Sequence, residues 1–337
     1  MIFFRKILFP FTIIYFLITC FRNILFDLQL LKSRSFDFPL IGVGNLSSGG
    51  TGKTPLVEYI FKNFSDSFNL SLLSRGYKRS GSGYVRAGDN SSPSLIGDEP
   101  YQIFKKFRNI QVAVDGNRVR GVENLINEIP NLQGVVLDDC FQHRYIDLKL
   151  NILLTTYQNP FFKDCILPSG NLRESSAGYH RADVIIVTKC PLSLNSIKMD
   201  EFKGSINLKN HQSLFFTSIE YNNTLFGKES IKLDKLKKFK ILLVTGIANN
   251  TPLLEFLNKQ NIEFDHLNFN DHHNYSTNDI EKIKKDYFDR IIITTEKDYI
   301  KINQLGLKND LYYLEIETKF LRDENSFKKI IRNTLSN

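Results

Sequence analysis

Short apolar runs alternate with amphipathic stretches along most of this chain. The apolar runs are rich in valine, isoleucine and leucine, and they predict strands at 38–44, 69–73, 110–114, 134–138, 151–155 and 183–188. Helix-like periodicity occupies 54–65, 99–108 and 117–128. Buried strands that alternate with helices usually form a parallel sheet with both faces covered. We therefore expect an α/β fold in which helices sandwich a mostly parallel sheet.

A second series of the same kind begins near residue 240. It predicts strands at 240–246, 262–268 and 290–294, with helices at 252–260 and 277–287. The stretch 228–240, just before it, is rich in lysine, which is typical of a solvated linker. We therefore predict a larger domain over 36–225 and a second, smaller α/β domain over 226–337.

A nearly unbroken apolar run covers residues 7–21, between Arg5-Lys6 on one side and Arg22 on the other. It is shorter than the roughly 20 residues that a membrane-spanning helix needs. One alternative is a secretory signal with a weak lipoprotein-like box ending at Cys20, and another is an ordinary buried helix. Apolar residues continue to Leu31 with cationic residues among them. We therefore favour an uncleaved, membrane-associated helix within 1–35 that lies at the membrane surface.

Composition and charge narrow the possible partners. A 337-residue chain with 42% hydrophobic and 24% charged residues is ordinary for a folded protein. Its four cysteines form no C-x-x-C pair, so neither a zinc site nor a disulfide framework is indicated. The net charge is +8, and the first 36 residues contribute +4 of it, as five cations against Asp27. This distribution favours a membrane surface over nucleic acid as the partner.

The hexapeptide 49–54, Gly-Gly-Thr-Gly-Lys-Thr, lies between a predicted strand and a predicted helix, which is the required context for a phosphate-binding loop. Its glycines permit backbone angles that turn N–H groups toward a phosphate chain, and the helix N-terminus adds a favourable dipole. Lys53 would reach the β- and γ-phosphates of ATP, while Thr54 would ligate Mg²⁺. The full motif has glycine where this chain has Ser47, and the alternative is a turn that binds nothing.

Acidic residues stand at two places where a phosphoryl-transfer enzyme could use them. Asp138 and Asp139 end a predicted strand, which would put a carboxylate beside Mg²⁺. Asp98 precedes a predicted helix and could accept the proton of an attacking hydroxyl. At both places the alternative is a helix cap. His272 lies in a polar loop, where a lone histidine is more often a surface residue than a catalytic one.

An ordered set of motifs resembles the tetraacyldisaccharide 4′-kinase family, the lipid A 4′-kinases. The motifs are Val43-Gly44-Asn45-Leu46, the loop with Pro55, Ser74-Arg75-Gly76-Tyr77, Gly97-Asp98-Glu99-Pro100, Asp115-Gly116-Asn117-Arg118, Asp138-Asp139-Cys140-Phe141-Gln142-His143-Arg144, Leu167-Pro168, Leu172-Arg173-Glu174, Asp271-His272 and Thr295-Glu296-Lys297-Asp298. Each motif is weak alone, whereas the set in this order, over residues 1 to about 300, is highly specific.

The resemblance implies a P-loop NTPase-like fold and an enzyme that uses ATP and Mg²⁺. It would phosphorylate the 4′-hydroxyl of a tetraacyldisaccharide 1-phosphate, the lipid A precursor, to give lipid IVA. The reaction would take place at the cytoplasmic face of the inner membrane of a Gram-negative bacterium. The smaller domain would close over the active site, and we expect a monomer.

The resemblance also implies roles for individual residues. The catalytic residues would be Asp98 as base, His272 paired with it, and Lys53. The nucleotide would be bound by Asn45, Ser48, Gly49, Gly50, Thr51, Gly52, Lys53 and Thr54. The metal would be held by Thr54, Asp138, Asp139 and Glu174.

Another class of protein competes with a lipid kinase. A switch ATPase of the deviant Walker A type, acting at the membrane, shares the pattern G-G-x-G-K-[ST], but its signature lysine is replaced here by Ser48. A GTPase is disfavoured because Thr188-Lys189-Cys190-Pro191 lacks the aspartate that reads guanine. ATP consumption that depends on a lipid-linked sugar would separate a kinase from a switch ATPase.

Overall fold

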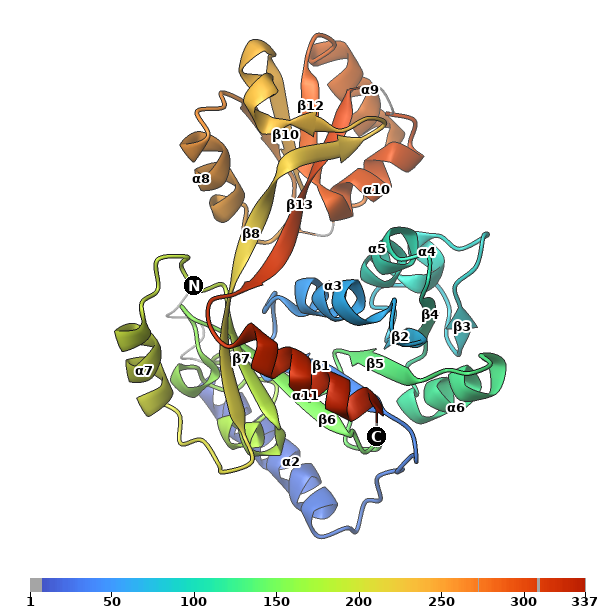
Figure 1. Ribbon diagram of the computed structural model, residues 1–337, viewed down its shortest axis with the longest axis vertical. Helices are drawn as coiled ribbons and strands as arrows, with labels where there is room; N and C mark the ends of the chain where they lie inside the picture. Colours follow the sequence, from blue (N-terminus) through green and yellow to red (C-terminus); the bar gives the residue numbers. More distant parts are fainter. Residues whose placement is uncertain (1–7, 272, 308–309, 337) are drawn as a thin grey trace. The chain divides into compact units, whose positions relative to one another are not determined.

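The computed structural model describes residues 8–271, 273–307 and 310–336, and the chain divides into two compact units (Figure 1). The first unit comprises Met1–Ile219 and Thr318–Asn337, and the second comprises Glu220–Glu317. Strand β8 (Ser213–Gly227) leads from the first unit into the second, and β13 (Leu311–Phe320) leads back.

The first unit is built on a mostly parallel sheet, which confirms the predicted fold class. All six strands expected before residue 190 are present: β1 (Leu40–Asn45), β2 (Leu70–Ser74), β4 (Gln111–Val114), β5 (Gly134–Asp138), β6 (Leu150–Thr156) and β7 (Val184–Thr188). Their order is β8-β7-β6-β1-β5-β2-β4-β3; the neighbours from β8 to β4 pair parallel, and the short β3 (Val85–Arg86) pairs antiparallel with β4. Because β1 is central, the loop after it lies at the middle of the carboxyl edge, where ligands bind in such sheets.

Helices cover the sheet of the first unit as the buried strands require. α3 (Lys53–Phe64) packs on β1 and β5, and α6 (Arg118–Glu128) packs on β2 and β4. α4 (Pro93–Ile96) and α5 (Asp98–Lys106) precede β4, and α7 (Ser196–Gly204) follows β7. Val135 and Leu137 of β5 pack in one cluster with Val122 and Leu125 of α6. All five residues of β5 are buried, so both faces of this strand are covered.

The last helix belongs to the first unit and not to the smaller domain to which the sequence assigned it. In α11 (Glu324–Ser336), Phe327, Ile331 and Leu335 share one buried stripe. Phe327 contacts the rings of Tyr59 and Phe215, and the Tyr59 hydroxyl donates to Glu324 at 2.6 Å. The division of the chain therefore differs from 36–225 and 226–337, because this apolar stripe is buried against α3 and β8.

The second unit is a smaller α/β unit with the strand order β11-β10-β12-β13-β8. Its elements are β10 (Ile241–Thr245), α8 (Thr251–Lys259), β11 (Asp265–Asn268), α9 (Thr277–Asp286), β12 (Ile291–Thr295) and α10 (Glu296–Gln304). The lysine-rich stretch forms β9 (Ile231–Lys232) and a 3-10 helix (Leu233–Lys238), whose Leu233 and Leu236 are buried in the core. It is thus part of the second unit and not a linker.

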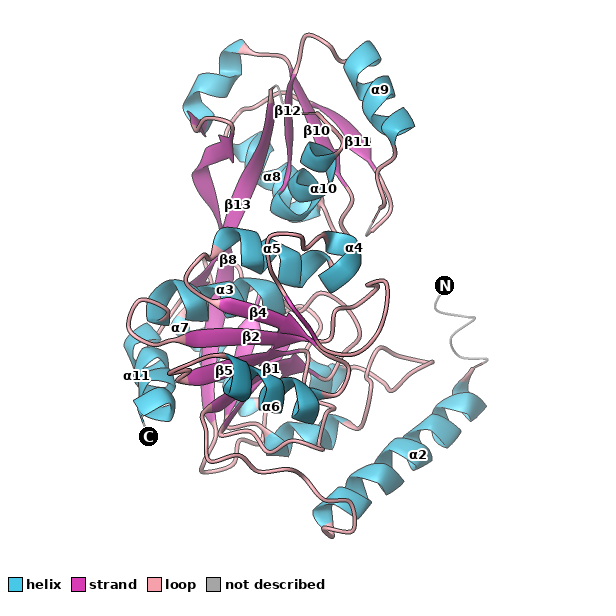
Figure 2. Cartoon of the chain, turned by 90° about the vertical axis from the view of Figure 1, so that its right-hand side faces the viewer, coloured by secondary structure: helices cyan, strands magenta, loops and turns pink. Residues whose placement is uncertain are grey.

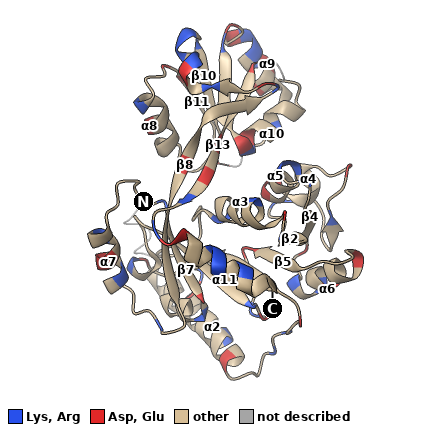
Figure 3. Ribbon diagram, viewed as in Figure 1, with Lys and Arg blue, Asp and Glu red and all other residues tan. Residues whose placement is uncertain are grey.

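Helix α2 (Phe9–Asp27) lies at the edge of the first unit, apart from its sheet (Figure 2), and its buried residues are Thr12 and Phe26. It is long and apolar enough to cross a membrane by length and composition, and 11% of its apolar window is buried. Phe11, Ile18 and Phe21 are each more than 60% exposed. The alternative of an ordinary buried helix is therefore wrong. The helix bears only Arg22 and Asp27 as charged residues (Figure 3).

Candidate active site

The phosphate-binding loop occupies the turn between β1 and α3, where the sequence placed it. Gly49 and Gly52 have φ angles of 124° and 88°, a region that side chains disfavour. Gly52 is the N-cap of α3, so the free N–H groups of the first helical turn face the loop. Ser48, Gly49 and Gly50 form its exposed tip, whereas Thr51 is buried and its carbonyl accepts from Thr188 at 2.7 Å. The loop is therefore anchored at one end and open at its tip.

Lys53 projects from the first position of α3 toward Asp139, which follows the neighbouring strand β5. Its Nζ lies 3.4 Å from Asp139 Oδ1 and 3.3 Å from Asn45 Oδ1. Asn45 in turn donates to the Ser47 carbonyl at 2.7 Å and so shapes the start of the loop. Of the expected nucleotide-binding residues, Asn45 and Lys53 are in direct contact, and the rest form the loop around them.

Asp138 and Asp139 lie at the carboxyl end of β5 but in different environments. Burial raises the pKa of Asp138 to about 7, Glu99 adds to the rise, and Lys53 opposes it. Its Oδ1 is buried and has no hydrogen-bond partner among the described residues. Burial also acts to raise the pKa of Asp139, but Lys53 and Arg173 outweigh it, so this pKa is lowered. Asp139 has a φ of 48°, which aspartate tolerates.

Arg173 and Glu174 serve this cluster in different ways. Arg173 donates to both carboxylate oxygens of Asp139, at 2.9 and 3.0 Å. Glu174 is 1% exposed, and both of its oxygens are occupied. Oε1 accepts from Arg181 at 2.9 Å and from Gln142 at 3.1 Å, and Oε2 accepts from Asn23 at 2.8 Å. This geometry makes Glu174 a buried hydrogen-bonding centre that joins Arg181, Gln142 and Asn23.

Asp98 stands in the first turn of α5, where the N-cap is Gly97 and not Asp98 itself. Two glycines bring this turn to the end of β2. A Cβ on Gly97 would lie 3.3 Å from the Gly76 Cα, and a Cβ on Gly76 would lie 3.1 Å from the Ile96 carbonyl. Asp98 is therefore on the same carboxyl edge as the loop. Its neighbour Glu99 is close enough for its charge to raise the pKa of Asp138.

His272 falls outside the described residues, so its pairing with Asp98 stays a prediction. Its sequence neighbours belong to the second unit. There, Asp271 forms an ion pair with Lys297 at 3.5 Å, and the Phe269 and His273 rings stack with centroids 4.5 Å apart.

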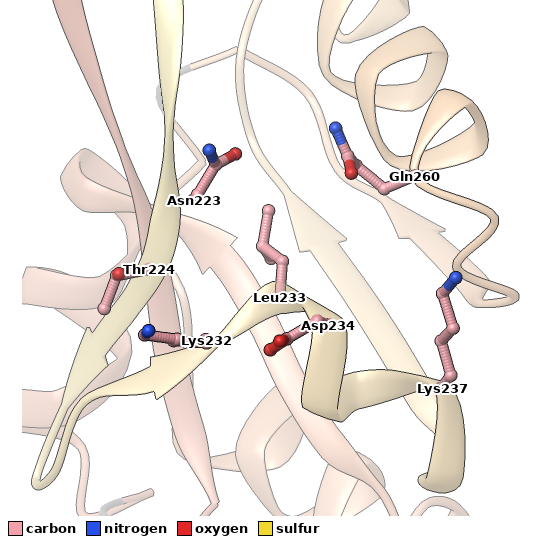
Figure 4. Close-up of a pocket in the computed structure, with 7 residues that line it drawn as sticks. All are labelled: Asn223, Thr224, Lys232, Leu233, Asp234, Lys237 and Gln260. Carbon is pink, nitrogen blue, oxygen red and sulfur yellow. The ribbon is translucent and has the colours of Figure 1, made fainter.

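The second unit also contains a pocket of about 390 Å³ (Figure 4). It is lined by Asn223, Thr224, Lys232, Leu233, Asp234, Lys237 and Gln260. Both lysines and Asp234 are exposed side chains, and Figure 4 shows Lys237 at the edge of the group. Solvated charges of this kind do not define a binding site, so the candidate site remains the phosphate-binding loop and its acids.

Gln142 and Arg118 also contribute to the site, although the sequence assigned no role to either. Gln142 donates to the Asn45 carbonyl at 2.9 Å and to Glu174, and so connects β1 with the Arg173-Glu174 motif. Arg118 is 3% exposed and donates to the main-chain oxygens of Asp115 and Asp138, which holds the ends of β4 and β5 together. Both lie in motifs of the resemblance, but spacing alone does not reveal these long-range partners.

Comparisons with known proteins agree with this geometry. The family described as tetraacyldisaccharide-1-P 4′-kinase matches residues 4–336. A tetraacyldisaccharide 4′-kinase of Flavobacterium johnsoniae is 46% identical over 96% of this chain and 95% of its own length. One of Bacteroides thetaiotaomicron is 42% identical over 95% and 90%. The crystal structure of LpxK from Aquifex aeolicus in complex with ATP is 30% identical, with a TM-score of 0.80 over 98% of this chain and 99% of that chain.

Proposed function

This chain belongs to the tetraacyldisaccharide-1-P 4′-kinase family, and we propose that it transfers the γ-phosphate of ATP to the 4′-hydroxyl of a tetraacyldisaccharide 1-phosphate in lipid A biosynthesis. The product would be lipid IVA. The observation that carries the proposal within the molecule is the contact of Lys53 with Asp139 beside an open glycine loop. A lysine and a strand-end aspartate at this edge are what phosphoryl transfer from ATP requires.

The loop would bind the triphosphate of ATP through its main-chain N–H groups, as helix N-termini do for anions. Lys53 would move from Asp139 to the β- and γ-phosphates, because phosphate oxygens offer it a stronger charge partner in the loaded site. Arg173 would keep Asp139 in place, since it holds both carboxylate oxygens. The neighbour from Aquifex aeolicus binds ATP, which supports a nucleotide at this loop.

The residues at the strand end fit a magnesium ion. Hard cations such as Mg²⁺ prefer oxygen ligands, and the unpartnered, buried Oδ1 of Asp138 is such an oxygen. We propose that Thr54, Asp138 and Asp139 hold the ion, and we leave Glu174 out because its side chain is 1% exposed and paired with Arg181, whereas that of Asp139 is 28% exposed. Mg²⁺ supplies charge neutralisation of the phosphates when bound.

Asp98 is the proposed general base. Its carboxylate would accept the proton of the 4′-hydroxyl while that oxygen bonds to the γ-phosphorus, and the bond from the γ-phosphorus to the bridging oxygen would break, releasing ADP. The position of Asp98 on the carboxyl edge supports this assignment. We keep His272 as its proposed partner on the strength of the motif Asp271-His272.

We propose that α2 lies at the surface of the inner membrane on its cytoplasmic side. One face of the helix, with Thr12, Tyr15 and Asn23, makes hydrogen bonds to the first unit. The remaining surface presents exposed aromatic and aliphatic side chains, the pattern of an interfacial helix. This placement would bring a lipid acceptor to the loop while ATP enters from the cytoplasm.

The decisive experiment is an ATP-consumption assay with purified protein, with and without a tetraacyldisaccharide 1-phosphate in mixed micelles. We expect ADP release only with the lipid, and a product heavier by one phosphate in mass spectrometry. ATP hydrolysis that is independent of the lipid would favour the switch ATPase of the deviant Walker A type and contradict the kinase.

The placement of α2 has its own test in vesicle flotation. Replacing the exposed Phe11 and Ile18 with glutamate should release the protein from anionic vesicles, because buried CH₂ groups contribute about 0.8 kcal/mol each. The affinity for ATP should stay unchanged. A variant that still floats fully with the vesicles would show that the anchor lies elsewhere.

A further inference from the structure

Helix α2 is joined to the candidate active site by hydrogen bonds from its polar face. Asn23 Nδ2 donates to Glu174 Oε2 at 2.8 Å, and the Tyr15 hydroxyl donates to the Arg173 carbonyl at 2.9 Å. Arg22 donates to the Gln142 carbonyl at 3.0 Å. The three acceptors lie in the two motifs that surround Asp139.

Glu174 is the point where these bonds meet. Its buried carboxylate accepts from α2 on one oxygen and from Gln142 and Arg181 on the other. Gly178 leaves room for it, since a Cβ there would lie 3.2 Å from Glu174 Oε2. A buried charge is costly unless it is paired and hydrogen-bonded, and this one is both.

The Glu174 carboxylate also fixes which way the Gln142 amide points. Gln142 Nε2 has two acceptors, Glu174 Oε1 at 3.1 Å and the Asn45 carbonyl at 2.9 Å. Because a carboxylate can only accept, the amide nitrogen must face it. Gln142 Oε1 is then left to face Arg173, whose nitrogen lies 3.4 Å away and also holds Asp139.

We propose that Glu174 is a positioning residue that couples α2, through Asn23, to the Gln142–Arg173–Asp139 set and thereby orients Asp139 for phosphoryl transfer. The inference rests on the proposed kinase function. It replaces the expectation that Glu174 binds the metal. It also gives α2 a part in catalysis that is separate from membrane attachment.

The test exploits the direction of the bond between Asn23 and Glu174. Asn23→Asp places a second carboxylate against Glu174 and should lower kcat by about tenfold or more. Adding Glu174→Gln reverses the bond, because the introduced amide can donate to the new aspartate while its oxygen still accepts from Gln142 and Arg181. The double variant should therefore regain much of the lost kcat. The KM for ATP, the Mg²⁺ requirement and vesicle flotation should stay near wild type in both.

Thr19 offers a matched control on the same helix. Its hydroxyl donates to the Phe16 carbonyl at 3.0 Å, within α2 itself. Thr19→Asp adds the same charge one turn from Asn23 on the same side of α2 but leaves the bond between Asn23 and Glu174 in place, so it should lower kcat less than Asn23→Asp does. A double variant no better than Asn23→Asp would overturn the proposal. So would a Glu174→Gln single variant whose main defect is a raised Mg²⁺ requirement, since that result would return Glu174 to the metal site.

A second measurement does not depend on kinase activity. Hydrogen exchange of the backbone at 138–144 should be faster in Asn23→Asp than in wild type, and slow again in the double variant. Unchanged exchange in this segment would overturn the coupling even if the chain proved inactive on the lipid. Loss of lipid-dependent activity in the wild-type protein would contradict the proposed function, whereas an active wild type with unresponsive variants would contradict only this inference.

Discussion

Each of the two units has a parallel strand, a glycine-containing turn and a helix, but the space over the two turns differs. In the first unit, a Cβ on Gly49 would meet nothing within 4 Å, so the space over the turn after β1 is open. In the second, Gly246 follows β10, and its N–H donates to Asp298 Oδ2 at 2.9 Å. A Cβ on Gly246 would meet Asp298 Oδ1 at 3.0 Å. One turn is open to an external anion, and the other holds a carboxylate of the chain itself.

The difference shows that the architecture alone does not specify nucleotide binding. The turn after β1 leads directly into Lys53, whereas the turn 246–251 contains no lysine. Unpaired backbone N–H groups attract anions, and in the second unit Asp298 of α10 supplies the anion for the Gly246 N–H. Function therefore depends on the residues placed on the fold, and each prediction below tests whether the open turn and the filled turn differ as described.

The largest effect is expected at Asp98, which stands beside the open turn and would act on the acceptor. Asp98→Ala should lower kcat by about 10² to 10⁴, the usual range for a general base. The affinity for ATP should stay close to wild type, because the base contacts the sugar and not the nucleotide. Steady-state kinetics and ATP titration measure the two quantities. A parallel fall in both would assign Asp98 to the metal site.

Lys53 tests the open turn itself. Lys53→Ala removes the cation of the loop and should lower kcat/KM by roughly 10² or more, as loss of a transition-state charge partner does. Lys259→Ala, in the last turn of α8 in the second unit, is the matched control and should leave kcat/KM unchanged. Near-normal activity of Lys53→Ala in a folded protein would rule out the loop as the nucleotide site.

The sequence predicts some elements of the fold and misses others, and the reason is physical. Strand and helix signals are local, so the six strands of the first sheet and the loop at 49–54 follow directly from apolar runs and glycines. β13 and α11 are not among the predicted elements, and the assignment of the C-terminus to the smaller domain differs from the structure. The burial of Phe327 against Tyr59 joins residues far apart in the chain, which no local pattern encodes.

The candidate site shows the same limit. Lys53, Asp138 and Asp139 were predictable as neighbours because parallel strands end at one edge, whereas Asn45 was assigned through the family resemblance. The partners of Glu174 were not, because Asn23 is 151 positions away and its contact depends on how α2 docks. The motif places Glu174 near these acids, but it does not reveal which donors its carboxylate meets.

Asp298 tests the filled turn. Asp298→Ala leaves the Gly246 N–H without its acceptor and should destabilise the second unit by about 1–3 kcal/mol, the cost of an unsatisfied buried donor. Asp298→Asn keeps an oxygen for the N–H and should cost less. Chemical denaturation, monitored by hydrogen exchange of the backbone at 241–246, measures the loss of stability. ATP affinity should stay within about twofold of wild type, and a large fall would mean that this turn also serves the nucleotide.

The smallest effect is expected at Asp138. Its substitution should stabilise the metal-free protein, whereas substitution of Asp298 should destabilise the second unit. Burial raises the pKa of Asp138 to about 7, from about 3.9 in an unfolded chain. Between these values the folded protein binds more protons than the unfolded one, so the metal-free protein loses stability as pH rises through this window. Asp138→Asn removes that dependence because it carries no charge.

In the absence of metal and nucleotide, we therefore expect Asp138→Asn to melt about 2–4 °C above wild type at pH 8 and by a smaller margin at pH 5, where only the lower part of this pH window has been crossed. The two buried aspartates would then respond oppositely to removal, since Asp298 Oδ2 accepts bonds from Gly246 and Thr295 while Asp138 Oδ1 has no partner among the described residues. Thermal unfolding in EDTA at both pH values gives the measurement. A destabilised Asp138→Asn at pH 8 would show that the carboxylate stabilises the empty site, and the contrast between an open and a filled anion position would fail.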